Sequence, residues 1–158
     1  MRFSTHADIE IPIEQAFARL ADFDAVERMA LRRGTDITRL DSAGPVAAGT
    51  TWDTRLVLRG RKRRVMARLA EFVPPGLMQF EASSDSFEAD FRVELTALSR
   101  ARTRVGVTLD LRARTLPARL MMQSARLAKN RLNRRFKKRV SAYLFEVEER
   151  HRRANGGN

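Results

Sequence analysis

The chain has no cysteine, so disulfide bridges and thiolate metal sites are excluded. Its histidines, His6 and His151, are too few and too far apart in sequence to predict a metal site or a catalytic triad. No apolar run approaches the roughly 20 residues that span a bilayer, and residues 1–10 lack the apolar segment of a secretory signal. The sequence therefore predicts a cytoplasmic protein with no metal and no cofactor, and it leaves membrane association open.

Acidic residues are also scarce. The 158 residues include 19 Asp and Glu against 31 Lys and Arg, which gives a formal net charge of +12. An excess of this size attracts polyanions and anionic surfaces but carries no information about fold. The length suits one domain with one core. We expect that domain over residues 1–151 and a disordered tail over residues 152–158.

Much of the chain alternates between apolar and polar residues, which is typical of strands with one buried face. The first such segment covers residues 2–10. Six further strands are predicted at residues 36–40, 50–59, 63–72, 77–82, 87–98 and 103–113. The turns between these six, such as Ser42–Pro45, Gly60-Arg61 and Ser83–Ser86, are short. Consecutive strands joined so closely must be antiparallel neighbours.

Two short helices are predicted between the first and second strands. The earlier one covers residues 12–20 and begins at Pro12, where a first helical turn tolerates proline. The later one covers residues 23–32, with Asp22 or Asp24 as its N-cap.

One long C-terminal helix is predicted from Pro117 to Arg150, because apolar residues recur there at steps of three or four. This apolar stripe consists of Met121, Ala125, Ala128, Leu132, Phe136, Val140, Tyr143 and Val147. Lys and Arg flank it, and no acid occurs before Glu146. The stripe indicates packing against an apolar surface, whereas the basic flank must face water or an anionic partner.

Together these elements predict an α+β fold in which a curved antiparallel sheet of about seven strands wraps on the long C-terminal helix. Two short helices follow the first strand. A single helix cannot fill the whole concave face of such a sheet. We therefore expect a cavity between sheet and helix, and small molecules commonly bind in such places.

Several segments resemble a known superfamily. They are Ile9–Phe17 followed by Leu20–Phe23, Gly49–Trp52, Val73–Phe80 and Thr103–Val105. With the order of elements, they resemble the START-like superfamily, also called SRPBCC, and within it the polyketide cyclase/dehydrase-like proteins. The resemblance covers nearly the whole chain and implies a helix-grip fold. It identifies no catalytic residue, because members of the superfamily range from ligand carriers to enzymes.

The candidate ligand site consists of inward-facing positions of the sheet and the long helix. The predicted cavity-lining residues are Thr5, Trp52, Thr54, Leu56, Val65, Phe80, Phe87, Phe91, Val107, Leu109, Met121, Ser124 and Ala128. The strand carboxylates fall on the opposite, solvated face: Asp53, Glu81, Glu88, Asp90, Glu94 and Asp110. No carboxylate interrupts the apolar pattern of the inner face, so no catalytic residue is predicted.

A second candidate site is the basic surface. Its predicted anion-binding residues are Arg61, Lys62, Arg63, Arg64, Arg119, Arg126, Arg131 and Arg134. These cations either serve solubility alone, attract an anionic membrane, or bind nucleic acid. The long helix lacks amide clusters and exposed stacking aromatics, so a membrane is favoured over nucleic acid.

Three functions follow as hypotheses. The first is binding of a hydrophobic small molecule or lipid in the cavity, with a basic surface that favours anionic membranes or ligands. The second is a polyketide cyclase/dehydrase-like enzyme, which requires an inward-pointing carboxylate, His or Tyr. The third is a basic interaction module for nucleic acid or an acidic protein. The oligomeric state stays open.

Overall fold

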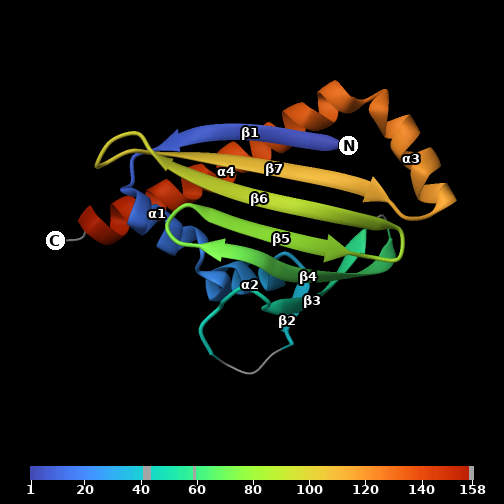
Figure 1. Cartoon of the computed structure of the whole chain (residues 1–158), viewed down its shortest axis with the longest axis horizontal. Coiled ribbons are helices and arrows are strands. Elements are labelled where there is room, and N and C mark those ends of the chain that lie inside the picture. Colours follow the sequence, from blue (N-terminus) through green and yellow to red (C-terminus); the bar gives the residue numbers. More distant parts are fainter. Residues whose placement is uncertain (41–43, 59, 157–158) are drawn as a thin grey trace.

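The computed structural model describes residues 1–40, 44–58 and 60–156. Its elements, drawn in Figure 1, are β1 (Arg2–Ile9), α1 (Ile13–Leu20), α2 (Phe23–Arg32), β2 (Asp36–Arg39), β3 (Thr51–Leu58), β4 (Arg61–Val73), β5 (Leu77–Ser83), β6 (Phe87–Ala97), β7 (Thr103–Ala113), α3 (Leu116–Arg126) and α4 (Lys129–Gly156). The predicted α+β fold, with two short helices after the first strand, is confirmed. The predicted turn residues Ser42 and Ala43 and the strand end at Arg59 lie outside the described residues.

The strands form one seven-stranded sheet in the order β1-β7-β6-β5-β4-β3-β2, and every neighbouring pair is antiparallel. Strands β2 to β7 are therefore a meander, as the short turns predict. β1 joins the far edge, and its register with β7 runs from Arg2 opposite Asp110 to Ile9 opposite Thr103. This pairing brings the first and last strands together.

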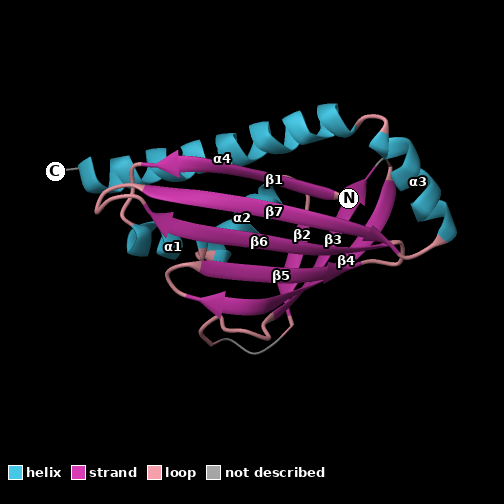
Figure 2. Cartoon of the chain, turned by 45° about the horizontal axis from the view of Figure 1, so that its top comes forward, coloured by secondary structure: helices cyan, strands magenta, loops and turns pink. Residues whose placement is uncertain are grey.

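The sheet is strongly curved, and its concave face is turned towards the helices. Figure 2 shows β3 crossing β6 and β7 at a steep angle, while α4 runs along the β1 side of the sheet. Strand β4 contains a register shift between Leu69 and Glu71. A bulge of this kind bends its strand and increases the local twist. The curvature therefore leaves space beneath the helices.

The predicted single helix from Pro117 to Arg150 is wrong, because the structure has two helices there, α3 and α4. Around Leu127 and Ala128 the amide N–H groups donate to the carbonyls three residues earlier, at 3.2 and 3.0 Å, which tightens the last turn of α3. The two helices also pack on different strands: α3 contacts β7, and α4 contacts β1. Leu and Ala are good helix formers, so nothing local in the sequence signals the break.

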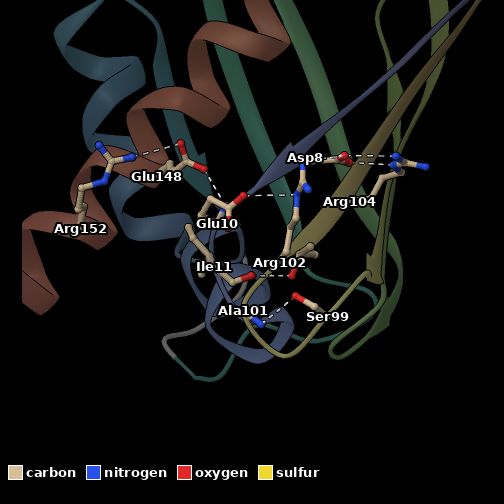
Figure 3. Close-up of polar contacts among 10 residues, drawn as sticks. Asp8, Glu10, Ile11, Ser99, Ala101, Arg102, Arg104, Glu148 and Arg152 are labelled. Atoms are coloured by element: carbon tan, nitrogen blue, oxygen red, sulfur yellow. Dashed lines mark hydrogen bonds and ion pairs between the residues drawn. The ribbon is translucent and has the colours of Figure 1, made fainter.

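Helix α4 continues to Gly156, so the disordered tail expected from Arg152 is wrong for the described part of that segment. Polar contacts hold this end of the helix (Figure 3). The backbone N–H of Glu10, just after β1, donates to the Glu148 carboxylate at 2.7 Å, and Arg152 lies 3.5 Å from the same side chain. One turn further, Arg19 of α1 donates to Nδ1 of the buried His151 at 2.9 Å. These contacts link the helix end to β1 and α1.

The core lies where α1 and the C-terminal half of α4 cover the sheet. Ile11 is fully buried, and Phe17 of α1 packs on Phe72 of β4 with 5.3 Å between ring centroids. From α4, Leu144 and Val147 complete this core. The opposite end of the concave face, beside α3, contains far fewer buried side chains.

Candidate ligand-binding site

A cavity of about 520 Å³ lies between the concave face of the sheet, α2 and α4. The sheet side of its wall consists of Ile37, Trp52, Thr54, Ala67, Met78, Phe80, Phe91, Val93, Val105 and Val107. The helix side consists of Leu20, Phe23, Val26, Glu27, Met29, Phe136, Arg139, Val140, Tyr143 and Leu144. This volume is within the range of small-molecule sites, and the wall is predominantly apolar, as in most such sites.

Strand alternation explains which residues reach the cavity. Trp52 and Thr54 share one face of β3, and in the register with β4 Trp52 lies opposite Ala67. A small residue opposite a large one leaves space beside the indole. Phe23 of α2 then packs over Trp52 and Phe80, with ring centroids 5.3 and 5.8 Å apart. The aromatic side chains thus form a continuous wall from the helix to the sheet.

One carboxylate, that of Glu27 on α2, lines the cavity. The indole Nε1–H of Trp52 donates a hydrogen bond to Oε1 of Glu27 at 2.9 Å, and this contact fixes the orientation of the carboxylate. The alternation of the strands does not predict Glu27, because this carboxylate reaches the cavity from a helix. The position does carry a signal: Glu27 is one turn after Phe23, so it falls on the apolar face of α2.

Helix α4 contributes two further polar groups, Arg139 and Tyr143, which are one turn apart on the cavity side. Burial raises the pKa of the Tyr143 hydroxyl, so the group stays protonated at neutral pH and can donate a hydrogen bond. Among the described residues, neither Tyr143 nor Arg139 has a hydrogen-bond or ion-pair partner. Both side chains are therefore available to a molecule in the cavity.

The predicted lining residues divide into two groups. Those on the cavity wall are Trp52, Thr54, Phe80, Phe91 and Val107. The others lie away from it: Thr5, Leu56, Val65, Phe87, Leu109, Met121, Ser124 and Ala128. The strand members of the second group share the concave face but lie at other positions along it. The helix members lie in α3 or at the break, where the chain has turned away from the cavity, and Met121 is 53% exposed.

Asp53 faces outward as predicted, yet it is buried beneath arginines rather than solvated. Arg64 donates two hydrogen bonds to its carboxylate at 2.9 and 3.1 Å, and Arg55 lies 3.6 Å away. The hydrogen bond from Arg64 is the main cause of the lowered pKa of Asp53. Among the predicted anion-binding residues, Arg64 is therefore paired with Asp53 within the protein, although its side chain is 62% exposed.

The remaining predicted cations differ in exposure. Arg63 is half-buried, whereas the others are exposed: Arg61, Lys62, Arg119, Arg126, Arg131 and Arg134. These exposed cations form no ion pair within residues 1–40, 44–58 and 60–156. In the same described ranges, no three His, Asp or Glu side chains are grouped to hold a metal ion, and no helix is long and apolar enough to cross a bilayer.

A family model described as polyketide cyclase / dehydrase and lipid transport matches residues 1–143. The chain belongs to this family. The match confirms the resemblance to the START-like superfamily that the sequence segments carry. Among curated proteins, none matches the chain in sequence.

Several solved structures share the fold at low sequence identity. TTHA0849 from Thermus thermophilus is 17% identical, with 95% of this chain and 96% of that chain covered and a TM-score of 0.66. The Zhui aromatase/cyclase from a Streptomyces species is 16% identical, with 98% and 95% covered and a TM-score of 0.66. A START superfamily protein from Mycobacterium smegmatis is 13% identical, with 85% and 95% covered and a TM-score of 0.56. At these identities the likeness shows the helix-grip fold alone.

Proposed function

We propose that this protein binds a hydrophobic small molecule or lipid in the cavity between the sheet, α2 and α4. The observation that carries the proposal is a cavity of about 520 Å³ whose wall is apolar and aromatic apart from a few polar groups. Such sites bind ligands chiefly through apolar contact and orient them through a small number of polar contacts. Membership of a family described by lipid transport and polyketide chemistry agrees with an apolar cargo.

The polar groups of the wall restrict the ligand further. Glu27 offers a carboxylate oxygen that can accept a hydrogen bond, while Tyr143 and Arg139 offer donors. Leaving the buried Tyr143 hydroxyl unpaired against a wholly apolar molecule is unfavourable. We therefore expect a ligand with an apolar body and at least one polar group directed at the helix side of the cavity.

The exposed basic surface, which includes Arg61, Lys62, Arg119 and Arg126, belongs to the same proposal. Each cation near an anionic membrane contributes about 1 kcal/mol to attraction. We propose that these cations favour anionic membranes or the anionic groups of ligands over neutral ones. This attraction requires no covalent chemistry and fits a carrier or sensor in the cytoplasm.

Native mass spectrometry of protein purified from its own host tests the cavity, because a co-purifying apolar molecule is the expected result. Titration with an apolar fluorescent probe, anilinonaphthalene sulfonate, supplies an affinity. Ala67→Phe fills the space beside Trp52 and should abolish probe binding, whereas Val57→Phe at a site 62% exposed should leave it unchanged. Equal binding by the parent and Ala67→Phe, or no binding by the parent, contradicts the proposal.

A second candidate is a polyketide cyclase/dehydrase-like enzyme, and Glu27 is the observation that favours it. A carboxylate oriented by an indole N–H inside an apolar cavity, with Tyr143 in the same wall, supplies an acid/base pair of the kind this chemistry needs. Turnover of a linear poly-β-keto substrate is the test. If the protein is an enzyme, Glu27→Gln abolishes turnover while substrate binding persists, and a parent protein without turnover removes this candidate.

A further inference from the structure

Helix α3 has an apolar stripe that no part of the described protein covers. Leu116 is 68% exposed, Leu120 is 56% exposed and Leu127 is 94% exposed. The helical conformation extends to Leu127, whose φ and ψ are −65° and −26°. At about 100° per residue, these leucines fall within about 40° of one another around the helix. They therefore lie on one exposed side of the helix, where exposed Gln123 separates Leu120 from Leu127.

The same helix is already anchored through its other face. Ala118 is 3% exposed and lies about half a turn from the leucine stripe. The Thr115 hydroxyl caps the helix by accepting from the N–H of Ala118 at 3.3 Å. The packing of α3 on β7 is thus satisfied without the leucines. The leucine stripe (Leu116, Leu120 and Leu127) is largely exposed and points away from the protein body.

Positive charge borders the leucine stripe. Arg119 and Arg126 lie together on one side of it, at about 80° to 100° around the helix axis, and both are exposed. No acidic residue occurs between Asp110 and Glu146. An apolar face bordered by cations, with no compensating acid, is typical of helices that lie in the interface of an anionic membrane.

The charge also argues against other occupants of this face. A second copy would bring two strongly basic surfaces together, which is unfavourable because like charges repel. A nucleic acid would use the arginines but has no contact to offer exposed leucines, and α3 presents no aromatic side chain for base stacking. An anionic membrane matches both components of this surface, because its acyl chains can contact the leucines and its head groups can pair with the arginines.

We propose that α3 is a membrane-contacting helix that inserts the leucine stripe among the acyl chains of an anionic bilayer. Arg119 and Arg126 then lie at the level of the lipid phosphates. In both views α3 stands at the opposite end of the molecule from α1 and the C-terminus (Figures 1 and 2). The proposal goes beyond ligand binding, because it holds whether or not the cavity is filled. It also requires that the leucines enter the bilayer, which attraction between charges alone does not.

Vesicle co-sedimentation tests it, with phosphatidylcholine vesicles that contain about one-third phosphatidylserine at about 0.15 M salt. Leu120→Gln/Leu127→Gln should weaken binding about tenfold or more, because each leucine loses burial in the acyl region. Arg119→Gln/Arg126→Gln should weaken it about fivefold per residue. The matched control is Leu31→Gln on α2, where a leucine is 65% exposed outside the cavity wall. This control should bind like the parent protein.

Because the chain has no cysteine, Leu127→Cys provides a unique site for a polarity-sensitive nitrobenzoxadiazole label. Its fluorescence should rise and shift to the blue with anionic vesicles, and the same label at Leu31→Cys should not respond. Vesicle binding that is insensitive to the leucine variants overturns insertion. So does tighter binding to an oligonucleotide than to vesicles, or a dimer that the leucine variants dissociate. The apolar-probe titration of the same variants is expected to be unchanged, so failure of membrane contact is distinguishable from failure of ligand binding.

Discussion

The two ends of the concave sheet face differ in how they are covered. At the end beside α1, buried side chains from α1, the sheet and the C-terminal half of α4 pack together, and hydrogen bonds hold the helix terminus. At the end beside α3, one short helix touches β7 and directs leucines outward. The cavity lies between these regions, under α2 and the middle of α4. The α1 end therefore supplies most of the buried packing, and the α3 end leaves apolar side chains exposed to a binding partner.

Of the substitutions that test this comparison, Phe17→Ala should cause the largest loss of stability. Phe17 is 4% exposed and packs on Phe72, so truncation removes apolar burial and leaves a void. We expect a loss of about 3–5 kcal/mol in the free energy of unfolding. Urea denaturation monitored by circular dichroism measures it. A loss below about 1 kcal/mol would mean that the α1 end is not the stable part of the molecule.

Glu148→Ala should have a smaller effect. It removes the acceptor of the Glu10 N–H, so α4 loses a charge-assisted contact to the end of β1. The expected cost is about 1 kcal/mol, with faster hydrogen exchange in the last turns of α4. Glu149→Ala is the matched control, because Glu149 accepts a hydrogen bond from Arg152 on the same helix. Equal effects of the two substitutions would show that the contact to Glu10 does not hold the helix end.

Acidification should weaken the same helix end through His151. Burial, with a smaller contribution from Arg19, lowers the pKa of His151 below its ordinary value of 6.5. The unfolded chain then binds the proton more readily, so this contribution to stability is present above pH 6.5 and is lost as pH falls through the folded-state pKa. His151→Gln keeps an acceptor for Arg19 but cannot titrate. Unfolding free energies at about pH 7.5 and about pH 5 should depend less on pH in this variant than in the parent.

Leu120→Ala should have the smallest effect on stability. Leu120 is 56% exposed on α3, so we expect a change within about 0.5 kcal/mol in the free energy of unfolding. Thermal and urea denaturation measure it beside Phe17→Ala. A cost comparable to that of a core substitution would show that the leucine stripe packs against the protein in solution, which removes the contrast between the two ends.

The sequence is most informative where periodicity carries the signal. Apolar alternation predicts the strands, short turns make them antiparallel neighbours, and the spacing of the last apolar residues places a helix over the concave face. Trp52, Thr54, Phe80, Phe91 and Val107 reach the cavity wall for this reason. Alternation fixes which face of a strand a residue occupies, but it says nothing about which part of that face a helix covers.

The break at Leu127 and the entry of Glu27 into the cavity depend on tertiary structure. Leu127 and Ala128 suit a continuous helix, yet α3 and α4 dock on different strands, so the axis must change direction between them. Glu27 becomes a cavity residue because α2 packs over β3, where the indole of Trp52 meets its carboxylate.

By itself, the sequence determined the strands, the antiparallel order of β2 to β7, the presence of a C-terminal covering helix and the excess of positive charge, because these follow from local periodicity and composition, whereas the pairing of β1 with β7 is a contact between distant residues. The tertiary structure decided where the cavity lies, which polar groups enter it and which leucines stay exposed. These features depend on the curvature of the sheet and on how each helix docks, and both arise from contacts between residues far apart in the chain.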